Sequence, residues 1–128
     1  MEMLLKFNTP EEGVSYITKA LEKKEKIMGF GHRVYKLLDP RSDIIKARAQ
    51  RLADRLKDQK YMQISQAIEK TLWNTKKLFP NADFYSATFY YLMGIPIPLY
   101  TPIFVFSRMA GWAAHILEQQ KNNRLIRP

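Results

Sequence analysis

The stretch TPEEGVSYITKALEKKEKIMGFGHRVYKLLDPRS, residues 9–42, decides the fold class. It opens with a helix start, in which Thr9 can cap, Pro10 suits the first helical position and Glu12 completes a capping box. Apolar residues then recur at helical spacing on one face, at Val14, Ile17 and Leu21. We expect this helix to end before the GFG sequence at residues 29–31.

Helix signals recur along the rest of the chain, whereas strand signals are scarce. Four further helices are expected: one that starts at Asp39-Pro40, one from about Ile64 to near Phe79, a short one from about Phe84 to Met93, and the last from Thr101-Pro102 to about Lys121. There is no internal repeat and no flexible linker. The sequence therefore predicts an all-α fold.

The last expected helix differs from the others because its apolar residues point in nearly every direction. They are Ile103, Phe104, Phe106, Met109, Trp112, Ile116 and Leu117. Such a helix is normally buried on most sides. We therefore expect it to pack against another subunit or against a part of the protein that this chain does not contain.

The composition narrows the classes of function. The chain has 128 residues, a net charge of +9 and no cysteine, and 46% of its residues are hydrophobic. This excludes a disordered polybasic chain, a disulfide scaffold and thiolate chemistry. The basic balance points to anionic partners, which include nucleic acid, membrane surfaces, phosphorylated cofactors and polycarboxylates.

Targeting and membrane signals are weak. The N-terminus lacks the basic start and apolar run of a signal peptide. The longest weakly charged stretch, residues 102–117, is shorter than the roughly 20 residues of a spanning helix and contains Arg108 and His115. We expect a soluble, cytoplasmic protein without a membrane partner.

The first candidate site is the loop GFGHRVYK, residues 29–36. Glycines on both sides of Phe30 let the backbone approach a ligand closely. The loop also holds His32, one of two histidines in the chain, with Arg33 and Lys36 nearby. From residue types alone, a solvated loop with an incidental histidine is an equal alternative.

Two charged residues lie at expected helix starts. Arg41 follows Asp39 and Pro40, where free backbone N–H groups and the helix dipole favour a carboxylate ligand. An exposed surface arginine is the alternative. Asp83 is either the N-cap of a helix that begins at Phe84 or a catalytic base shielded by aromatic residues.

Arg108 lies within the apolar last helix. A buried guanidinium needs a paired anion, and no acidic residue lies one turn away on either side. Its partner is expected to be a distant carboxylate or an acidic ligand, whereas His115 is expected to be a core or interface histidine. These residues predict an anion pocket built from residues 29–32, Arg41, Asp83 and Arg108, although spacing alone does not show that they converge.

A series of motifs extends these single signals over nearly the whole chain. In order they are MGFGHRVY at residues 28–35, DPR at 39–41, NADFYS at 81–86, GIP at 94–96, YTPIF at 100–104, SRMAGWAAH at 107–115 and NRLIRP at 123–128. In sequence, order and spacing, this series resembles the citrate synthase family. Several long matches in one order are far more specific than any one of them.

The resemblance implies a two-domain, all-α, homodimeric enzyme of the tricarboxylic acid cycle. Such an enzyme condenses acetyl-CoA with oxaloacetate to give citrate and CoA, and the related 2-methylcitrate synthase uses propionyl-CoA. Residues 1–8 would end a large-domain helix, residues 9–100 would form the small domain, and residues 101–128 would return to the large domain. No metal and no covalently bound cofactor are implied.

The resemblance also implies roles for individual residues. His32 would polarise the oxaloacetate carbonyl, and Asp83 would remove a proton from the thioester methyl group. The carboxylates of oxaloacetate and citrate would be held by Arg41 and Arg108, and Arg127 would reach the neighbouring subunit's site. The residues implied to contact CoA are Met28, Gly29, Phe30, Gly31, Arg33 and Lys36.

Departures from the family pattern leave the activity of this chain open. Family enzymes are about three times as long, and their enolate-stabilising histidine has no counterpart here, so we expect the chain to begin mid-protein and to be catalytically incomplete. Ala87 stands where many members have glycine. A stand-alone module that binds CoA or dicarboxylates is the alternative. A nucleic-acid binder is disfavoured because the basic residues form no recognition-helix or stacking motif.

Overall fold

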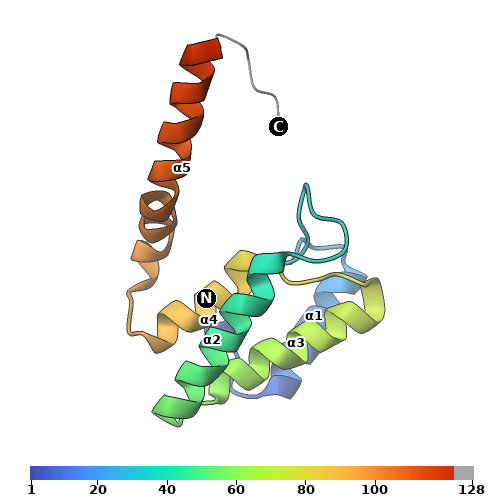
Figure 1. Ribbon diagram of the computed structural model, residues 1–128. Helices are drawn as coiled ribbons and strands as arrows, with labels where there is room; N and C mark the ends of the chain where they lie inside the picture. The colour runs from blue at the N-terminus through green and yellow to red at the C-terminus, as the bar shows by residue number, and fades with distance from the viewer. Residues whose placement is uncertain (123–128) are drawn as a thin grey trace. The chain divides into compact units, whose positions relative to one another are not determined.

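The computed structural model describes residues 1–122, so the expectation for Arg127 lies outside the described residues. The described chain contains only helices and loops, which confirms the all-α prediction (Figure 1). Two short 3₁₀ helices, η1 (Leu4–Lys6) and η2 (Ile97–Leu99), accompany the α-helices. The α-helices are α1 (Pro10–Glu22), α2 (Pro40–Leu56), α3 (Lys60–Lys76), α4 (Ala82–Leu92) and α5 (Tyr100–Asn122). They form two compact units, the first over Met1–Ile97 and the second from Pro98 onward.

The helix starts that the sequence predicts at α1 and α2 are confirmed. The Thr9 hydroxyl accepts the Glu12 N–H at 3.3 Å, and the Glu12 carboxylate accepts the Asn8 N–H at 2.8 Å. The Asp39 carboxylate accepts the Arg41 N–H at 3.1 Å. Both helices thus have a side-chain acceptor for a free backbone N–H and a proline in their first turn.

Two helices end on residues that carry no helix-stop signal in the sequence. The end caps of α2 and α3 are lysines in the left-handed conformation, Lys57 with φ 56° and Lys77 with φ 53°. The helix α1 ends at Glu22, well before Gly29. Lysine is not a typical left-handed residue, so the sequence carries no strong signal for these boundaries.

The core of the first unit consists of helix pairs. Helices α1 and α3 pack against each other, and α2 packs against α4. Gly13 brings α1 close to α3, because a Cβ at this position would lie 3.3 Å from both Ile64 and Ile68. The hydroxyls of Ser65 and Thr88 bond to each other at 3.0 Å between α3 and α4, so these buried polar groups are satisfied.

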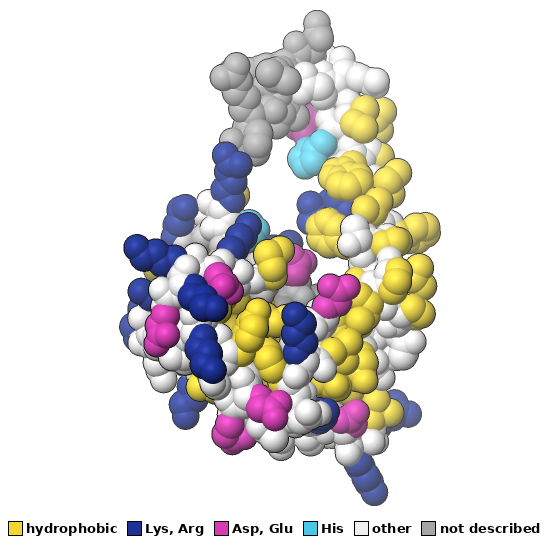
Figure 2. Space-filling view, turned by 180° about the vertical axis from the view of Figure 1, so that it is seen from behind, with side chains coloured by type: hydrophobic (Ala, Val, Ile, Leu, Met, Phe, Trp, Pro, Cys, Tyr) yellow, Lys and Arg dark blue, Asp and Glu magenta, His cyan; other side chains and the backbone are white. Residues whose placement is uncertain are grey.

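The last helix keeps its apolar side chains exposed in this chain, which is consistent with the expectation that it packs against a surface outside the chain. Phe106 is 86% exposed, and hydrophobic side chains follow α5 in Figure 2. The Arg108 guanidinium is exposed as well, and it lies 5.1 Å from the centroid of the Phe104 ring. Because both solvent and this ring stabilise its charge, Arg108 does not require a buried anion in this chain. His115 is also exposed, with Nδ1 3.5 Å from the Glu118 carboxylate.

The surface of the first unit carries charged side chains of both signs. On the face that Figure 2 shows, Lys and Arg side chains of the first unit alternate with Asp and Glu. Such mixing is typical of a solvated surface. None of the helices within residues 1–122 combines the length and the apolar character that a membrane crossing needs.

The GFG loop is held by a short antiparallel contact with the segment that precedes α4. The Gly31 N–H donates to the Phe79 carbonyl at 2.9 Å, and the Asn81 N–H donates to the Gly29 carbonyl at 2.9 Å. Gly29 has φ 87° and Gly31 has φ 74°. Both positions therefore favour glycine, and a Cβ at Gly29 would additionally lie 3.0 Å from the Phe84 ring.

The two glycines allow a matched test of this loop. We expect Gly31→Ala to lower the free energy of unfolding by about 1–2 kcal/mol, because a Cβ is disfavoured at positive φ but meets only open space here. Gly29→Ala should cost at least about 1 kcal/mol more, because Phe84 must also move. Urea unfolding followed by circular dichroism measures both values. Equal losses would contradict the close packing of Gly29 on Phe84.

Candidate functional site

Asp39 lies where the N-termini of α2 and α4 meet. One carboxylate oxygen accepts the Arg41 backbone N–H at 3.1 Å and Nε–H at 2.9 Å. The other accepts the Arg41 Nη2–H at 2.8 Å and the Ala82 N–H, at the start of α4, at 3.0 Å. The side chain is fully buried. The Arg41 side chain above all, with the two backbone N–H groups, lowers the pKa of Asp39 from 3.8 to about 2.

Arg41 is held by this carboxylate in a fixed position. Asp39 occupies its Nε and part of its Nη2, and Cζ lies 5.8 Å from the centroid of the Tyr35 ring. The hydrogen bonds that its guanidinium donates to Asp39 raise the pKa of Arg41, and the charge of Asp83 adds to the effect. The Arg41 side chain is 40% exposed. Its remaining N–H groups can therefore hold a ligand carboxylate end-on.

His32 is fixed by its own loop. Its Nδ1 accepts the backbone N–H of Val34 at 3.1 Å and that of Tyr35 at 3.2 Å, and its ring stacks on the Tyr35 ring with centroids 4.6 Å apart. A ring nitrogen that accepts hydrogen bonds carries no proton, so the proton of this tautomer is on Nε2. His32 is thus a hydrogen-bond donor at Nε2.

The donor atoms of His32 and Arg41 lie side by side. His32 Nε2 is 3.5 Å from Arg41 Nη2, and since both carry protons they do not satisfy each other. Two neighbouring donors suit a ligand that brings acceptor oxygens, such as a carbonyl next to a carboxylate. The structure therefore places these two predicted residues together.

Asp83 is not the N-cap of its helix, which corrects one of its two predicted roles. Asn81 is the cap, and its side-chain oxygen accepts the Asp83 N–H at 3.0 Å. The exposed Asp83 side chain lines a cavity of about 160 Å³. The other lining residues are Met1, Met3, Leu4, Met28, Gly29, Phe84 and Ala87. Methionines rather than several aromatic rings therefore surround this carboxylate.

Some of the loop residues expected to contact CoA lie at the Asp83 cavity or pack on Phe84, and the others are exposed. Met28 and Gly29 line the Asp83 cavity, and Phe30 packs on Phe84 with ring centroids 4.4 Å apart. A Cβ at Gly31 would meet nothing within 4 Å, so its backbone is open to close approach. Arg33 and Lys36 follow on the exposed part of the loop, where the Lys36 ammonium donates to the Arg33 carbonyl at 3.1 Å.

The first unit thus gathers His32, Arg41 and Asp83 at the starts of α2 and α4. Arg108 belongs to the second unit, and Arg127 lies beyond the described residues. Residue-type reasoning missed the bridging role of Asp39 and the contacts of Tyr35. The aspartate two positions before Arg41 is a sequence signal for the first of these roles. Within residues 1–122, no group of three His, Asp or Glu side chains is arranged to hold a metal ion.

Comparison with known proteins adds independent information. A family model described as citrate synthase, C-terminal domain, matches residues 1–128. Citrate synthase 2 of Bacillus subtilis is 53% identical over 128 residues, and 2-methylcitrate synthase of Shewanella oneidensis is 48% identical over 128 residues. Each match covers 100% of this chain and 34% of the relative. The chain therefore spans about a third of the length of these relatives.

Solved structures agree with the sequence matches. Citrate synthase of Thermotoga maritima superposes with a TM-score of 0.85 at 36% identity, over 99% of this chain and 35% of that one. Citrate synthase of Thermoplasma acidophilum gives a TM-score of 0.86 at 32% identity, again over 99% and 35%. The latter structure is a ternary complex with carboxymethyl coenzyme A and oxaloacetate.

The buried Asp39 predicts a specific pH dependence of stability. Its pKa is about 2 in the folded chain against 3.8 normally, so the ionised form stabilises the fold above pH 3.8 and this contribution disappears as the pH falls to about 2. We expect Asp39→Asn to lower the free energy of unfolding at pH 7 by about 2 kcal/mol and to flatten its change between pH 4 and pH 2.

Denaturant unfolding at a series of pH values measures this effect. Asp58→Asn is the matched control, because Asp58 is exposed and accepts only one long hydrogen bond, at 3.3 Å. An Asp39→Asn variant as stable as the control would contradict the role of Asp39 as the bridge between α2 and α4.

The orientation of His32 predicts its tautomer. We expect long-range ¹H–¹⁵N NMR spectra, recorded where both histidines are neutral, to show His32 as the Nε2–H form, because Nδ1 accepts two backbone N–H groups. His115, exposed on α5, is the internal reference. A protonated Nδ1 in neutral His32 would exclude the donor role of Nε2.

Proposed function

Because the chain belongs to the citrate synthase family, we propose that its first unit supplies His32 and Asp83 to the condensation of acetyl-CoA with oxaloacetate, which yields citrate and CoA. The orientation of His32 carries this proposal. Two backbone N–H groups fix its tautomer, and its donor nitrogen lies beside Arg41. This arrangement fits a 2-oxo dicarboxylate better than it fits an incidental histidine in a solvated loop.

Asp83 is the proposed base of the first step. A thioester α-proton is weakly acidic, so a carboxylate removes it only if the negative charge that develops on the thioester oxygen is stabilised. Asp83 takes the proton from the methyl group, and the C–H electrons form the enolate. The family resemblance gives neither His32 nor His115 the task of stabilising that enolate, so we assign it to a part of the enzyme outside this chain.

His32 is the proposed donor of the second step. The enolate carbon attacks the ketone carbon of oxaloacetate, a C–C bond forms, and the carbonyl electrons move to the oxygen. The Nε2–H of His32 stabilises this developing charge because its donor position is already fixed. The oxygen then takes up one proton to become a hydroxyl, which balances the proton that Asp83 removed. Water then cleaves the thioester bond to release CoA and citrate.

Arginines are the proposed ligands of the substrate carboxylates. Arg41 offers N–H groups that Asp39 leaves open, and its charge is permanent. By family resemblance, Arg108 holds a second carboxylate, and Arg127 serves the site of a second subunit in a homodimer. The solved ternary complex of the Thermoplasma acidophilum relative supports oxaloacetate and an acyl-CoA as ligands.

The proposal also covers the binding of CoA and the role of this domain in the whole enzyme. Residues 28–31, Arg33 and Lys36 contact CoA as co-substrate, and residues 9–100 form the small domain of a cytoplasmic enzyme in the tricarboxylic acid cycle. Closure of this domain on the rest of the enzyme excludes water from the enolate. No metal takes part in this chemistry.

Propionyl-CoA is the second candidate substrate, with 2-methylcitrate as product. One observation favours it, the cavity beside Asp83 with Ala87 and three methionines in its wall, and a 2-methylcitrate synthase is among the relatives at 48% identity. Because methionine side chains are flexible, this wall can adapt to one additional methyl group. Titration of the chain with acetyl-CoA and propionyl-CoA under identical conditions distinguishes the two acyl groups.

Calorimetric titration with oxaloacetate tests the proposed substrate site. We expect the purified chain to bind oxaloacetate, and Arg41→Gln to raise the Kd at least about tenfold through loss of a charge-assisted hydrogen bond. Arg55→Gln is the matched control, because Arg55 is exposed near the other end of α2. No binding, or equal Kd values for both variants, would contradict the proposal.

Release of CoA tests whether this chain is catalytically complete. With acetyl-CoA and oxaloacetate we expect no turnover by this chain alone, since the group that stabilises the enolate is assigned elsewhere. Robust CoA release would show that the chain contains all catalytic groups. Binding of oxaloacetate without turnover agrees with both the incomplete enzyme and the binding module. Adding the remaining domain of a relative distinguishes them, because regained turnover would favour the incomplete enzyme.

A further inference from the structure

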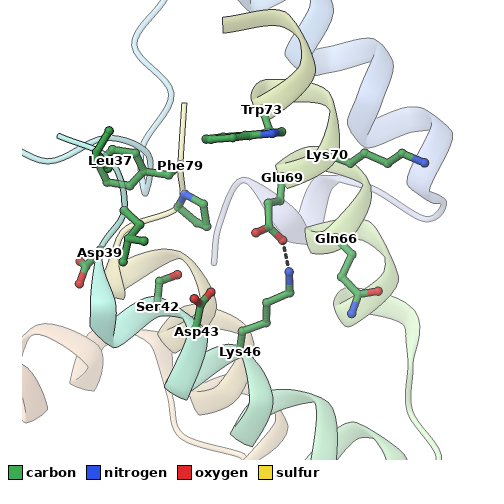
Figure 3. A pocket seen from close by; sticks show the side chains of 12 residues that line it. Leu37, Asp39, Ser42, Asp43, Lys46, Gln66, Glu69, Lys70, Trp73 and Phe79 are labelled. Atoms are coloured by element: carbon green, nitrogen blue, oxygen red, sulfur yellow. Dashed lines mark hydrogen bonds and ion pairs between the residues drawn. The ribbon is translucent and has the colours of Figure 1, made fainter. Parts of the chain in front are cut away.

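A second and larger cavity lies between α2 and α3 in the first unit (Figure 3). Its volume of about 520 Å³ falls in the range of small-molecule sites, roughly 300–1,000 Å³. Its apolar wall consists of Leu37, Leu38, Trp73, Phe79 and Pro80. With the cluster of His32, Arg41 and Asp39 it shares only Asp39, and no step proposed above uses it.

The cavity contains a buried hydroxyl without a partner. Ser42, in the first turn of α2, is 2% exposed, and its Oγ makes no hydrogen bond to any of the residues that the structure describes. Such an unsatisfied group costs about 1–3 kcal/mol, so its presence in a cavity wall points to a ligand that completes it. Figure 3 shows Ser42 next to Asp43 on the α2 side.

The unpaired charge that faces the cavity is negative. The Lys46 ammonium is neutralised by the Glu69 carboxylate at 2.5 Å, and Tyr85 donates its hydroxyl to the same carboxylate. Lys70 extends away from the cavity in Figure 3. Asp43 is exposed and has no ion-pair partner among the described residues. A cationic ligand would pair with it.

Trp73 forms the wall on the α3 side. Trp73 is 46% exposed and the Lys77 ammonium lies 5.4 Å from the centroid of its ring, so a ligand takes the part of the indole that Lys77 leaves open. An indole face attracts both cations and flat rings, and Leu37 and Phe79 continue the apolar surface beside it. The cavity therefore combines an aromatic platform with a carboxylate and a free hydroxyl.

We propose that this cavity binds a small organic cation with a flat apolar ring, an arylalkylammonium. The ring stacks on Trp73, and the ammonium donates to the Asp43 carboxylate and the Ser42 hydroxyl. This site does not depend on the function proposed above. It is a poor anion site, because Lys46 is paired with Glu69 and Lys70 extends away from the cavity, whereas the Asp43 carboxylate remains for a cation.

Fluorescence titration with 2-phenylethylammonium tests the proposal. Trp73 and Trp112 are the two tryptophans of the chain, so a Trp112→Phe background makes Trp73 the reporter. We expect a saturable change in its emission. In this background, Asp43→Asn should raise the Kd at least about tenfold and Ser42→Ala about fivefold, because each removes one hydrogen-bond partner of the ammonium. Asp58→Asn, an exposed aspartate outside the cavity wall, should leave the Kd unchanged.

Matched ligands keep the test independent of any variant's folding. 2-Phenylethanol keeps the ring without the charge, and butylammonium keeps the charge without the ring, so both should bind at least about tenfold more weakly. Three results would overturn the proposal: no saturable signal with 2-phenylethylammonium, equal affinity for 2-phenylethanol, or an unchanged Kd in Asp43→Asn with a native circular dichroism spectrum.

Discussion

The organisation of the first unit depends on one buried carboxylate. Two helix N-termini that begin side by side bring two positive dipole ends together, which is unfavourable without a negative charge between them. Asp39 supplies that charge, accepts a backbone N–H from each helix and still binds the guanidinium of Arg41. The starts of α2 and α4 therefore stay adjacent, and the side chains that follow them share one region.

The chemical character of the site follows from this arrangement. The N–H groups at helix starts, the guanidinium of Arg41 and the Nε2–H of His32 are all donors, and Asp39 uses both of its oxygens internally. Asp83, by contrast, keeps its carboxylate open to the cavity beside it. One part of the site thus favours oxygen acceptors, and the neighbouring part offers a base. This division suits a reaction between a carboxylated ketone and a C–H acid.

Local rules account for much of the fold but for little of the site's geometry. The caps at Thr9 and Asp39 were predictable because a side-chain acceptor precedes a proline. The boundaries at Lys57 and Lys77 were not, since lysine seldom adopts the left-handed conformation that both residues have. Residue types suggested His32 and Arg41, but only the folded loop shows that Tyr35 contacts both. Arg108 was expected to be buried because it lies among large apolar residues, but helix periodicity does not show which surface of α5 is covered, and in this chain the residue is exposed.

The contact between the GFG loop and the segment before α4 also bears on how the chain folds. Gly31 and Asn81 are 50 residues apart, and the whole of α2 and α3 lies between them. Closing so long a loop costs chain entropy, which the docking of the intervening helices must first offset. On this ground we expect the donor and base groups to come together late in folding. A change in α3 that slows helix docking would delay their assembly, although α3 contributes none of them.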